Sequence, residues 1–129
     1  MSARLRRVAS VLALLLAFVA PASADEFRPA YLQLKQLDAT TYDVLWRVPA
    51  LDANTTLRLQ PVFPPGTQEL TQRSSSYASN AAVLRWRIRV DDGMAGKAIE
   101  FPQLPGSRVD VLVRVERADG TEQLGRVLP

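Results

Sequence analysis

The stretch AVLRWRIRV, residues 82–90, decides the fold class of the chain. Its apolar and charged side chains alternate, with Leu84, Trp86, Ile88 and Val90 in one set and Arg85, Arg87 and Arg89 in the other. Successive side chains of a β-strand point to opposite faces of a sheet, so this period of two predicts a strand with one buried and one solvated face. Such alternation is typical of an antiparallel sheet that packs on one side only.

The same period of two recurs before and after this stretch. In residues 42–48 the inward set is Tyr42, Val44, Trp46 and Val48. In residues 109–116 the valines at positions 109, 111, 113 and 115 face inward, and the side chains directed to solvent are Asp110, Arg114 and Glu116. Weaker strands are predicted at residues 30–35, 56–60, 98–101 and 123–128, the last two as edges of the sheet.

Turn residues separate the predicted strands. The Asp-Asp-Gly at residues 91–93 ends the arginine-rich strand, and the Asp-Gly at residues 119–120 is a hairpin signal between two strand-like runs. Prolines followed by glycine predict turns between strands at residues 64–66 and 104–106. Residues 67–80 have little periodicity and predict a long loop with, at most, a short strand near 69–72.

Seven or eight short strands without a helix of three turns predict an all-β fold. We expect an antiparallel two-sheet β-sandwich of immunoglobulin-like type, and a small β-barrel is the alternative. Three long strands and two tryptophans supply enough apolar side chains for a core without disulfides.

The first 24 residues have the composition of a cleaved secretory signal peptide. Arg4, Arg6 and Arg7 precede an apolar run, residues 8–20, in which Ser10 is the one polar residue. The small residues at 22–24 form a cleavage site, so we expect cleavage between Ala24 and Asp25 and a single domain over residues 25–129. A retained membrane anchor is the weaker alternative, because spanning needs about 20 apolar residues.

Charge and composition limit the partners of the exported chain. The leader holds three of the 16 basic residues and none of the 13 acidic ones, so the chain without it is neutral. A neutral domain has no electrostatic reason to bind nucleic acid or an anionic membrane surface. No later apolar stretch reaches membrane-spanning length. The excess of Ala, Leu, Arg and Val over Lys suits a GC-rich bacterium, so we expect a periplasmic or secreted protein.

The absence of Cys and His excludes several kinds of site. No disulfide, thiolate nucleophile, Ser-His-Asp triad or imidazole metal site can form. No nucleophile stands beside a base, and the adjacent acids Asp91 and Asp92 suit a turn rather than a calcium loop. We therefore expect no catalytic residues, no metal site and no cofactor.

The row of Arg85, Arg87 and Arg89 is the most distinct candidate site. Guanidinium groups match carboxylates and phosphates, so the row could bind an anion or an acidic partner. The favoured alternative is an ordinary solvated face whose arginines pair across strands with Asp110, Glu116 or Glu100. A second candidate, an aromatic cleft for a sugar or peptide, would use Tyr31, Tyr42, Trp46 and Trp86. Aromatics at strand spacing more often belong to a core.

Four segments together resemble the extracytoplasmic β domain of the HupE/UreJ family. They are DEFRPAYL at residues 25–32, YDVLWRVP at 42–49, GMAGKAI at 93–99 and VDVLVRVERADG at 109–120. The resemblance implies an exported β domain of the kind that precedes a bundle of membrane helices in proteins with hydrogenase, urease and nickel-uptake accessory roles. This sequence contains no such helices, so no metal-handling residue is carried over.

Three functional hypotheses follow. The first is a non-catalytic accessory domain that binds a separate polytopic membrane protein, through an exposed apolar surface or through an edge strand such as residues 123–128. The second is a periplasmic module that binds a small anion. The third is a truncated remnant of a longer HupE/UreJ-family protein. The sequence does not indicate an oligomeric state.

Overall fold

The computed structural model describes Arg7 and residues 28–51 and 55–129. The predicted leader and its cleavage site between Ala24 and Asp25 lie outside the described residues. Within the described part of the chain, no helix is both long and apolar enough to cross a membrane.

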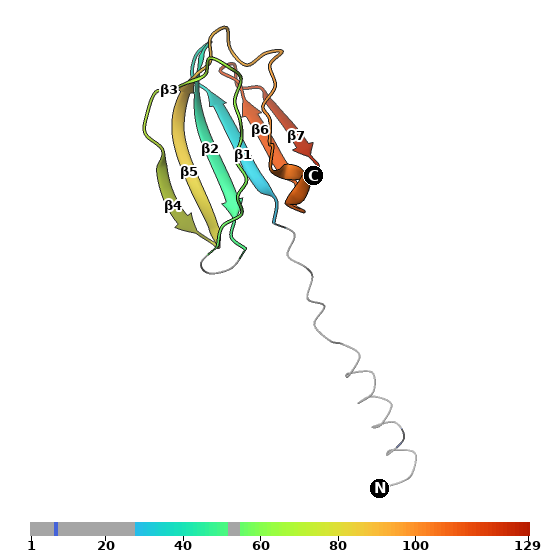
Figure 1. The fold of residues 1–129 in the computed structure, drawn as a ribbon. Coiled ribbons are helices and arrows are strands. Elements are labelled where there is room, and N and C mark those ends of the chain that lie inside the picture. Colours follow the sequence, from blue (N-terminus) through green and yellow to red (C-terminus); the bar gives the residue numbers. More distant parts are fainter. Residues whose placement is uncertain (1–6, 8–27, 52–54) are drawn as a thin grey trace.

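The described chain folds into an all-β structure, as predicted. Its elements are β1 (Ala30–Gln36), β2 (Thr41–Pro49), β3 (Gln68–Glu69), β4 (Ser74–Ala78), β5 (Ala81–Arg89), the 3₁₀ turn η1 (Leu104–Gly106), β6 (Val111–Glu116) and β7 (Glu122–Val127). The seven strands form one open sheet in the order β3-β5-β2-β1-β6-β7, and β4 also pairs with β5 (Figure 1). The barrel alternative is therefore wrong.

The sheet is mixed, whereas the sequence predicted a purely antiparallel arrangement. β1 pairs with β6 in parallel, and every other described pair is antiparallel. The reason is the long connection 90–110, which crosses the core face and returns the chain to the end of the sheet where β1 starts. A parallel pair needs a crossover of about a dozen or more residues, and alternation within a strand does not reveal one.

The predicted second sheet is replaced by irregular segments. Residues 55–67 and 90–110 cover one face of the sheet, which we call the core face. The Gln60 N–H donates to the Gln103 Oε1 at 3.3 Å, and the two segments also form the isolated pair Val62–Glu100. Reciprocal backbone hydrogen bonds of 2.7 and 2.9 Å form this pair. The strands expected at 56–60 and 98–101 do not form. Prolines at 61, 64, 65 and 102 explain this, because proline lacks the N–H that a strand ladder needs.

The segment predicted as a long loop, residues 67–80, contains two edge strands. β4 has only exposed side chains, so no hydrophobic alternation marks it. It reverses into β5 through Ser79 and Asn80, whose φ angles of 51° and 58° are those of a two-residue type I′ hairpin. β3 lies at 68–69, just before and partly overlapping the expected position.

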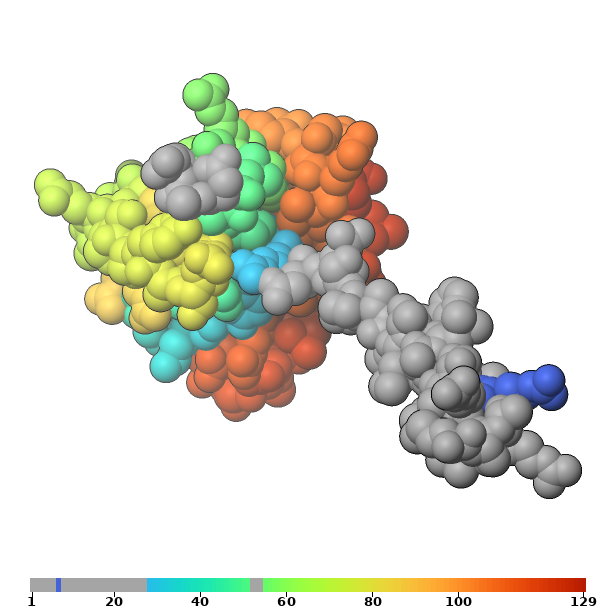
Figure 2. All heavy atoms as spheres, turned by 90° about the horizontal axis from the view of Figure 1, so that it is seen from below, coloured from blue at the N-terminus to red at the C-terminus, as the bar shows by residue number. Residues whose placement is uncertain are grey.

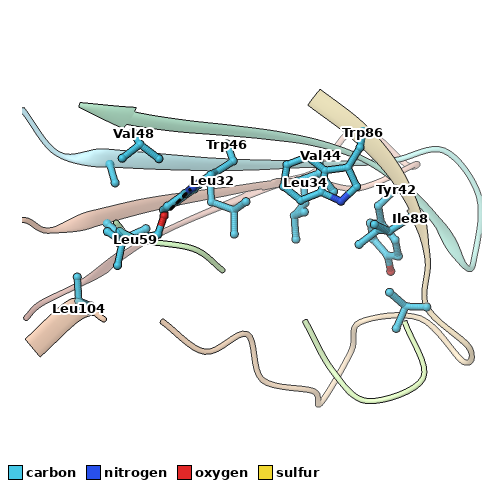
Figure 3. Close-up of a cluster of buried hydrophobic side chains, with 13 residues drawn as sticks. Leu32, Leu34, Tyr42, Val44, Trp46, Val48, Leu59, Trp86, Ile88 and Leu104 are labelled. Atoms are coloured by element: carbon cyan, nitrogen blue, oxygen red, sulfur yellow. Dashed lines mark hydrogen bonds between the residues drawn. The ribbon is translucent and has the colours of Figure 1, made fainter. Parts of the chain in front are cut away.

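The core lies between the sheet and the irregular layer (Figure 3). The alternation predicted for β2 and β5 is confirmed, and the aromatics Tyr42, Trp46 and Trp86 are buried core residues. Trp46 donates its indole N–H to the Leu59 carbonyl at 3.1 Å, which ties the irregular layer to β2. Each large apolar side chain buried here contributes about 1.5–3 kcal/mol.

Asp110 differs from the prediction that it points to solvent. It is buried, with 6% of its surface exposed, and it forms an ion pair with Arg126 of β7. Asp110 lies just before β6, where its backbone carbonyl accepts a hydrogen bond from Ala30 N–H at 2.9 Å. β6 begins at Val111, two residues later than expected, and the neighbouring strand β7 covers the carboxylate.

Candidate binding surfaces

The predicted arginine row lies on the face of the sheet opposite the core, which we call the outer face. Arg87 donates to the Asp43 carboxylate of β2 at 2.8 Å, and this hydrogen bond, together with the charge of Asp43, raises the pKa of the Arg87 guanidinium. Arg89 lies 3.5 Å from Asp91 in the turn after β5. The acids expected to pair with the row, Asp110, Glu116 and Glu100, are therefore not its partners.

Arg85 differs from the other two arginines. No acidic residue of the described chain forms an ion pair with it. It lines a groove of about 510 Å³ on the outer face, together with Arg87, Lys35, Asp43, Gln33 and Ser74. We call this the arginine groove. Its lining includes three cationic side chains and one carboxylate, so it can hold a small anion.

A second groove of about 480 Å³ lies on the core face, between the β6–β7 hairpin and residues 94–99. We call it the valine groove. Its apolar lining comes from Leu34, Tyr42, Met94, Ile99, Val113 and Val115. Lys97 and Arg117 also line it, and no acidic residue of the described chain does.

The wall of the valine groove is held in place by a tight turn. Gly93 has a φ of 75°, and a side chain there would place its Cβ 2.9 Å from the Ala39 carbonyl oxygen. The next residue, Met94, donates its backbone N–H to the Tyr42 hydroxyl at 3.0 Å. These contacts fix the start of the loop 94–99 against the sheet, so the groove is preformed.

The β6–β7 hairpin forms the opposite wall, and its turn is the one predicted from Asp-Gly. Arg117 N–H donates to the Thr121 carbonyl at 2.8 Å, and Gly120 N–H donates to the Arg117 carbonyl at 2.9 Å. The Asp119 carboxylate accepts from the hydroxyl and the N–H of Thr121, which lowers the pKa of Asp119 below its ordinary value of 3.8.

Two ion pairs on the outer face connect β7 to β6 and to Asp110, the residue just before β6. Arg114 binds Glu122, and Arg126 binds Asp110. The pKa of Arg114 is raised, first by the hydrogen bond to Glu122 and then by one to Tyr31. These contacts hold β7 against β6.

Sequence reasoning found the arginine row but missed the rest of both grooves. In the alternation over residues 42–48 Asp43 belongs to the outward-facing set, and this could have identified it as the partner of Arg87. The valine groove depends on which loop crosses the sheet, and no local pattern gives that. Among the described residues, no group of three or more His, Cys, Asp or Glu could hold a metal ion.

Comparisons with known proteins give no relative. No protein-family model, curated protein or solved structure matches the chain.

Proposed function

We propose that the chain is an exported, non-catalytic accessory domain that binds an extracytoplasmic segment of a separate polytopic membrane protein in the valine groove. The observation that carries the proposal is the groove itself, apolar along the sheet, bordered by Lys97 and Arg117 and free of acidic lining in the described chain. The leader supports export. The resemblance to the HupE/UreJ family supports a membrane protein, of the metal-uptake kind, as the partner.

The lining of the valine groove defines the segment that would fit. Its volume of about 480 Å³ lies within the range of about 300–1,000 Å³ that is usual for binding pockets. Val113, Val115 and Ile99 favour apolar side chains, and the two cationic groups favour an acidic residue beside them. We therefore propose an apolar segment with at least one carboxylate.

The domain's own composition favours an accessory role over metal transport. Nickel prefers imidazole and similar donors, and the chain has neither His nor Cys. A kinship with immunoglobulin-like sandwiches is also proposed, supported by a core that lies between two layers, of which one is irregular.

Gly125 offers a direct test of the groove. It lines the groove from β7, and a Cβ added there meets no atom within 4 Å, so Gly125→Trp fills the groove without straining the fold. Gly106 is the matched control, because a Cβ there also meets open space and the residue lies outside the groove. Tagged variants are expressed in the source organism, and the gently solubilised membrane fraction is purified on the tag.

We expect the parent chain and Gly106→Trp to recover the same multi-spanning membrane protein, identified by mass spectrometry. Gly125→Trp should lose at least about 90% of it, which corresponds to about 1.4 kcal/mol of binding energy. Equal recovery with Gly125→Trp would contradict the groove as the contact. Recovery of no membrane protein by the parent chain would contradict the accessory function.

A small-anion module is the second candidate, and Arg85 is the observation that favours it. The test is calorimetric titration of the full chain with inorganic phosphate. Arg85→Gln should abolish binding, whereas Arg89→Gln, which removes an arginine paired with Asp91 outside the groove, should leave it unchanged. Absence of phosphate binding by the parent chain would contradict this candidate.

A further inference from the structure

β7 is an open edge of the sheet. Its one partner among the described strands is β6, and it is the outermost strand on its side in Figure 1. The space-filling view from below shows the red C-terminal segment and the yellow-green segment with β4 on opposite sides of the molecule (Figure 2). All six residues of β7 are exposed, and Leu124 is 74% exposed. An unpaired edge presents a row of N–H and C=O groups to another strand.

The hairpin turn shows which backbone groups face that edge. Arg117 donates to Thr121, which lies opposite it when the β6–β7 register is extended. Hydrogen-bonded and non-hydrogen-bonded pairs alternate along an antiparallel ladder. The hydrogen-bonded pairs are therefore Val115–Gln123, Val113–Gly125 and Val111–Val127. The N–H and C=O groups left facing the edge belong to Glu122, Leu124 and Arg126.

We propose that a second copy of this chain pairs with β7, antiparallel and about a two-fold axis at Leu124. In this register Leu124 lies opposite Leu124 of the second copy. Glu122 lies opposite Arg126 of the second copy, and Arg126 opposite its Glu122. All three residues direct their backbone groups to the edge, so each pair makes the two reciprocal hydrogen bonds of a narrow pair. Their side chains share the outer face, where opposite charges and apolar pairs stabilise a ladder.

The other two-fold registers are less favourable. Centring the axis on residue 122 or 126 places Glu122 against Glu122 or Arg126 against Arg126, and like charges directly opposite destabilise a sheet. Centring it on residue 123 or 125 places Leu124 opposite a charged residue. Leu124 is the one centre that matches both charge and hydrophobicity.

The ion pairs within each copy are compatible with the new contacts. The Arg126 side chain is 58% exposed while it binds Asp110, and the Glu122 side chain is 42% exposed while it binds Arg114. A guanidinium has five donors and a carboxylate accepts at two oxygens, so each can hold a partner in both copies. The pairing would set the two valine grooves side by side on the core face, because Gln123 and Gly125 line them.

Leu124→Pro tests the pairing. Its N–H faces the edge and not β6, so proline in both copies removes the two central hydrogen bonds between copies but none of the β6–β7 ladder. The full chain is expressed with its predicted leader. The mass of the exported protein is then measured by analytical ultracentrifugation over a range of concentrations. We expect the mass to rise to twice that of the protomer for the parent chain. It should stay at one protomer for Leu124→Pro, with an unchanged circular dichroism spectrum. A parent chain that keeps the protomer mass at every concentration overturns the proposal.

A cysteine variant tests the register and does not depend on the fold of the proline variant. The chain has no cysteine, so Leu124→Cys can only cross-link between copies. The Cα atoms at the axis would be about 5.5 Å apart, within disulfide range. Leu128→Cys is the control, because Leu128 is also exposed, at 65%, but the two copies of it would lie about 27 Å apart along the strands.

We expect a disulfide dimer under mild oxidation from Leu124→Cys and none from Leu128→Cys. Equal cross-linking of both variants overturns the register. This inference does not rest on the membrane partner. If Gly125→Trp loses that partner while Leu124→Cys fails to cross-link, the pairing fails and the proposed function stands. If Leu124→Cys cross-links while the parent chain recovers no membrane protein, the pairing stands and the proposed function fails.

Discussion

The two tryptophans of the core occupy chemically different sites. Trp46 and Trp86 are 1% and 3% exposed, but only the first indole N–H has a hydrogen-bond partner among the described residues. Trp86 instead packs under the Arg73 guanidinium, 4.1 Å from its ring centre, and against the edge of Phe63. A buried donor without an acceptor destabilises the fold, whereas a buried donor that is hydrogen-bonded stabilises it.

Replacement of each tryptophan by phenylalanine should therefore have unequal effects. Trp46→Phe leaves the buried Leu59 carbonyl without its donor, and Trp86→Phe removes a donor that has no acceptor. We expect the free energy of unfolding to fall by about 1–3 kcal/mol more for Trp46→Phe, measured by urea denaturation. Both variants lose a similar ring volume, so each is the control for the other. Equal losses would contradict the assigned difference.

At the scale of elements, two turns make the stability of the fold depend on pH. Asp38 accepts from the backbone N–H groups of Thr40 and Thr41, both at 2.9 Å, in the turn between β1 and β2. The Thr40 N–H is the leading cause of a pKa of Asp38 below its ordinary value of 3.8. Asp119 has a lowered pKa for the same kind of reason in the β6–β7 turn.

The sign of this effect predicts acid destabilisation. A carboxylate with a lower pKa in the folded than in the unfolded state stabilises the fold above about pH 4, and this stabilisation is lost as the pH falls through the folded value. We expect the Tm of the parent chain to fall more steeply below pH 4 than that of the variant Asp38→Asn/Asp119→Asn. Melting curves by circular dichroism from about pH 6 to about pH 2 measure this. Parallel pH profiles would contradict the role of these two turns.

The elements also show how far the sequence predicts the fold. Alternation identified β1, β2, β5 and β6 because each packs apolar side chains on one face. β4 has none to pack, and only its pairing with β5 makes it a strand. At residues 56–60 the alternation of Leu57 and Leu59 correctly predicted a buried Leu59, but the prolines that follow prevent a ladder.

The candidate sites follow the same division. The arginine row could be predicted, because parity along one strand places its three side chains on one face. Its partner Asp43 comes from a neighbouring strand, and the walls of the valine groove come from segments about 20 residues apart in sequence that only the crossover connection brings together. A local sequence pattern therefore does not predict the properties that depend on how elements pair with one another.

At the scale of the whole molecule, two surfaces of the same hairpin have separate proposed roles. The core face of β6 and β7 lines the valine groove, and the free edge of β7 is self-complementary about Leu124. A dimer through this edge would present two grooves to one membrane protein. Avidity between two linked sites can strengthen binding without any new contact.

The most direct test of the accessory function is site-specific photo-cross-linking in living cells of the source organism. A photoreactive amino acid is placed at residue 125, inside the valine groove, or at residue 106 as the control. The account predicts an adduct from residue 125, and none from 106, that contains a multi-spanning membrane protein. Adducts of equal yield from both positions, or none from residue 125, would contradict it.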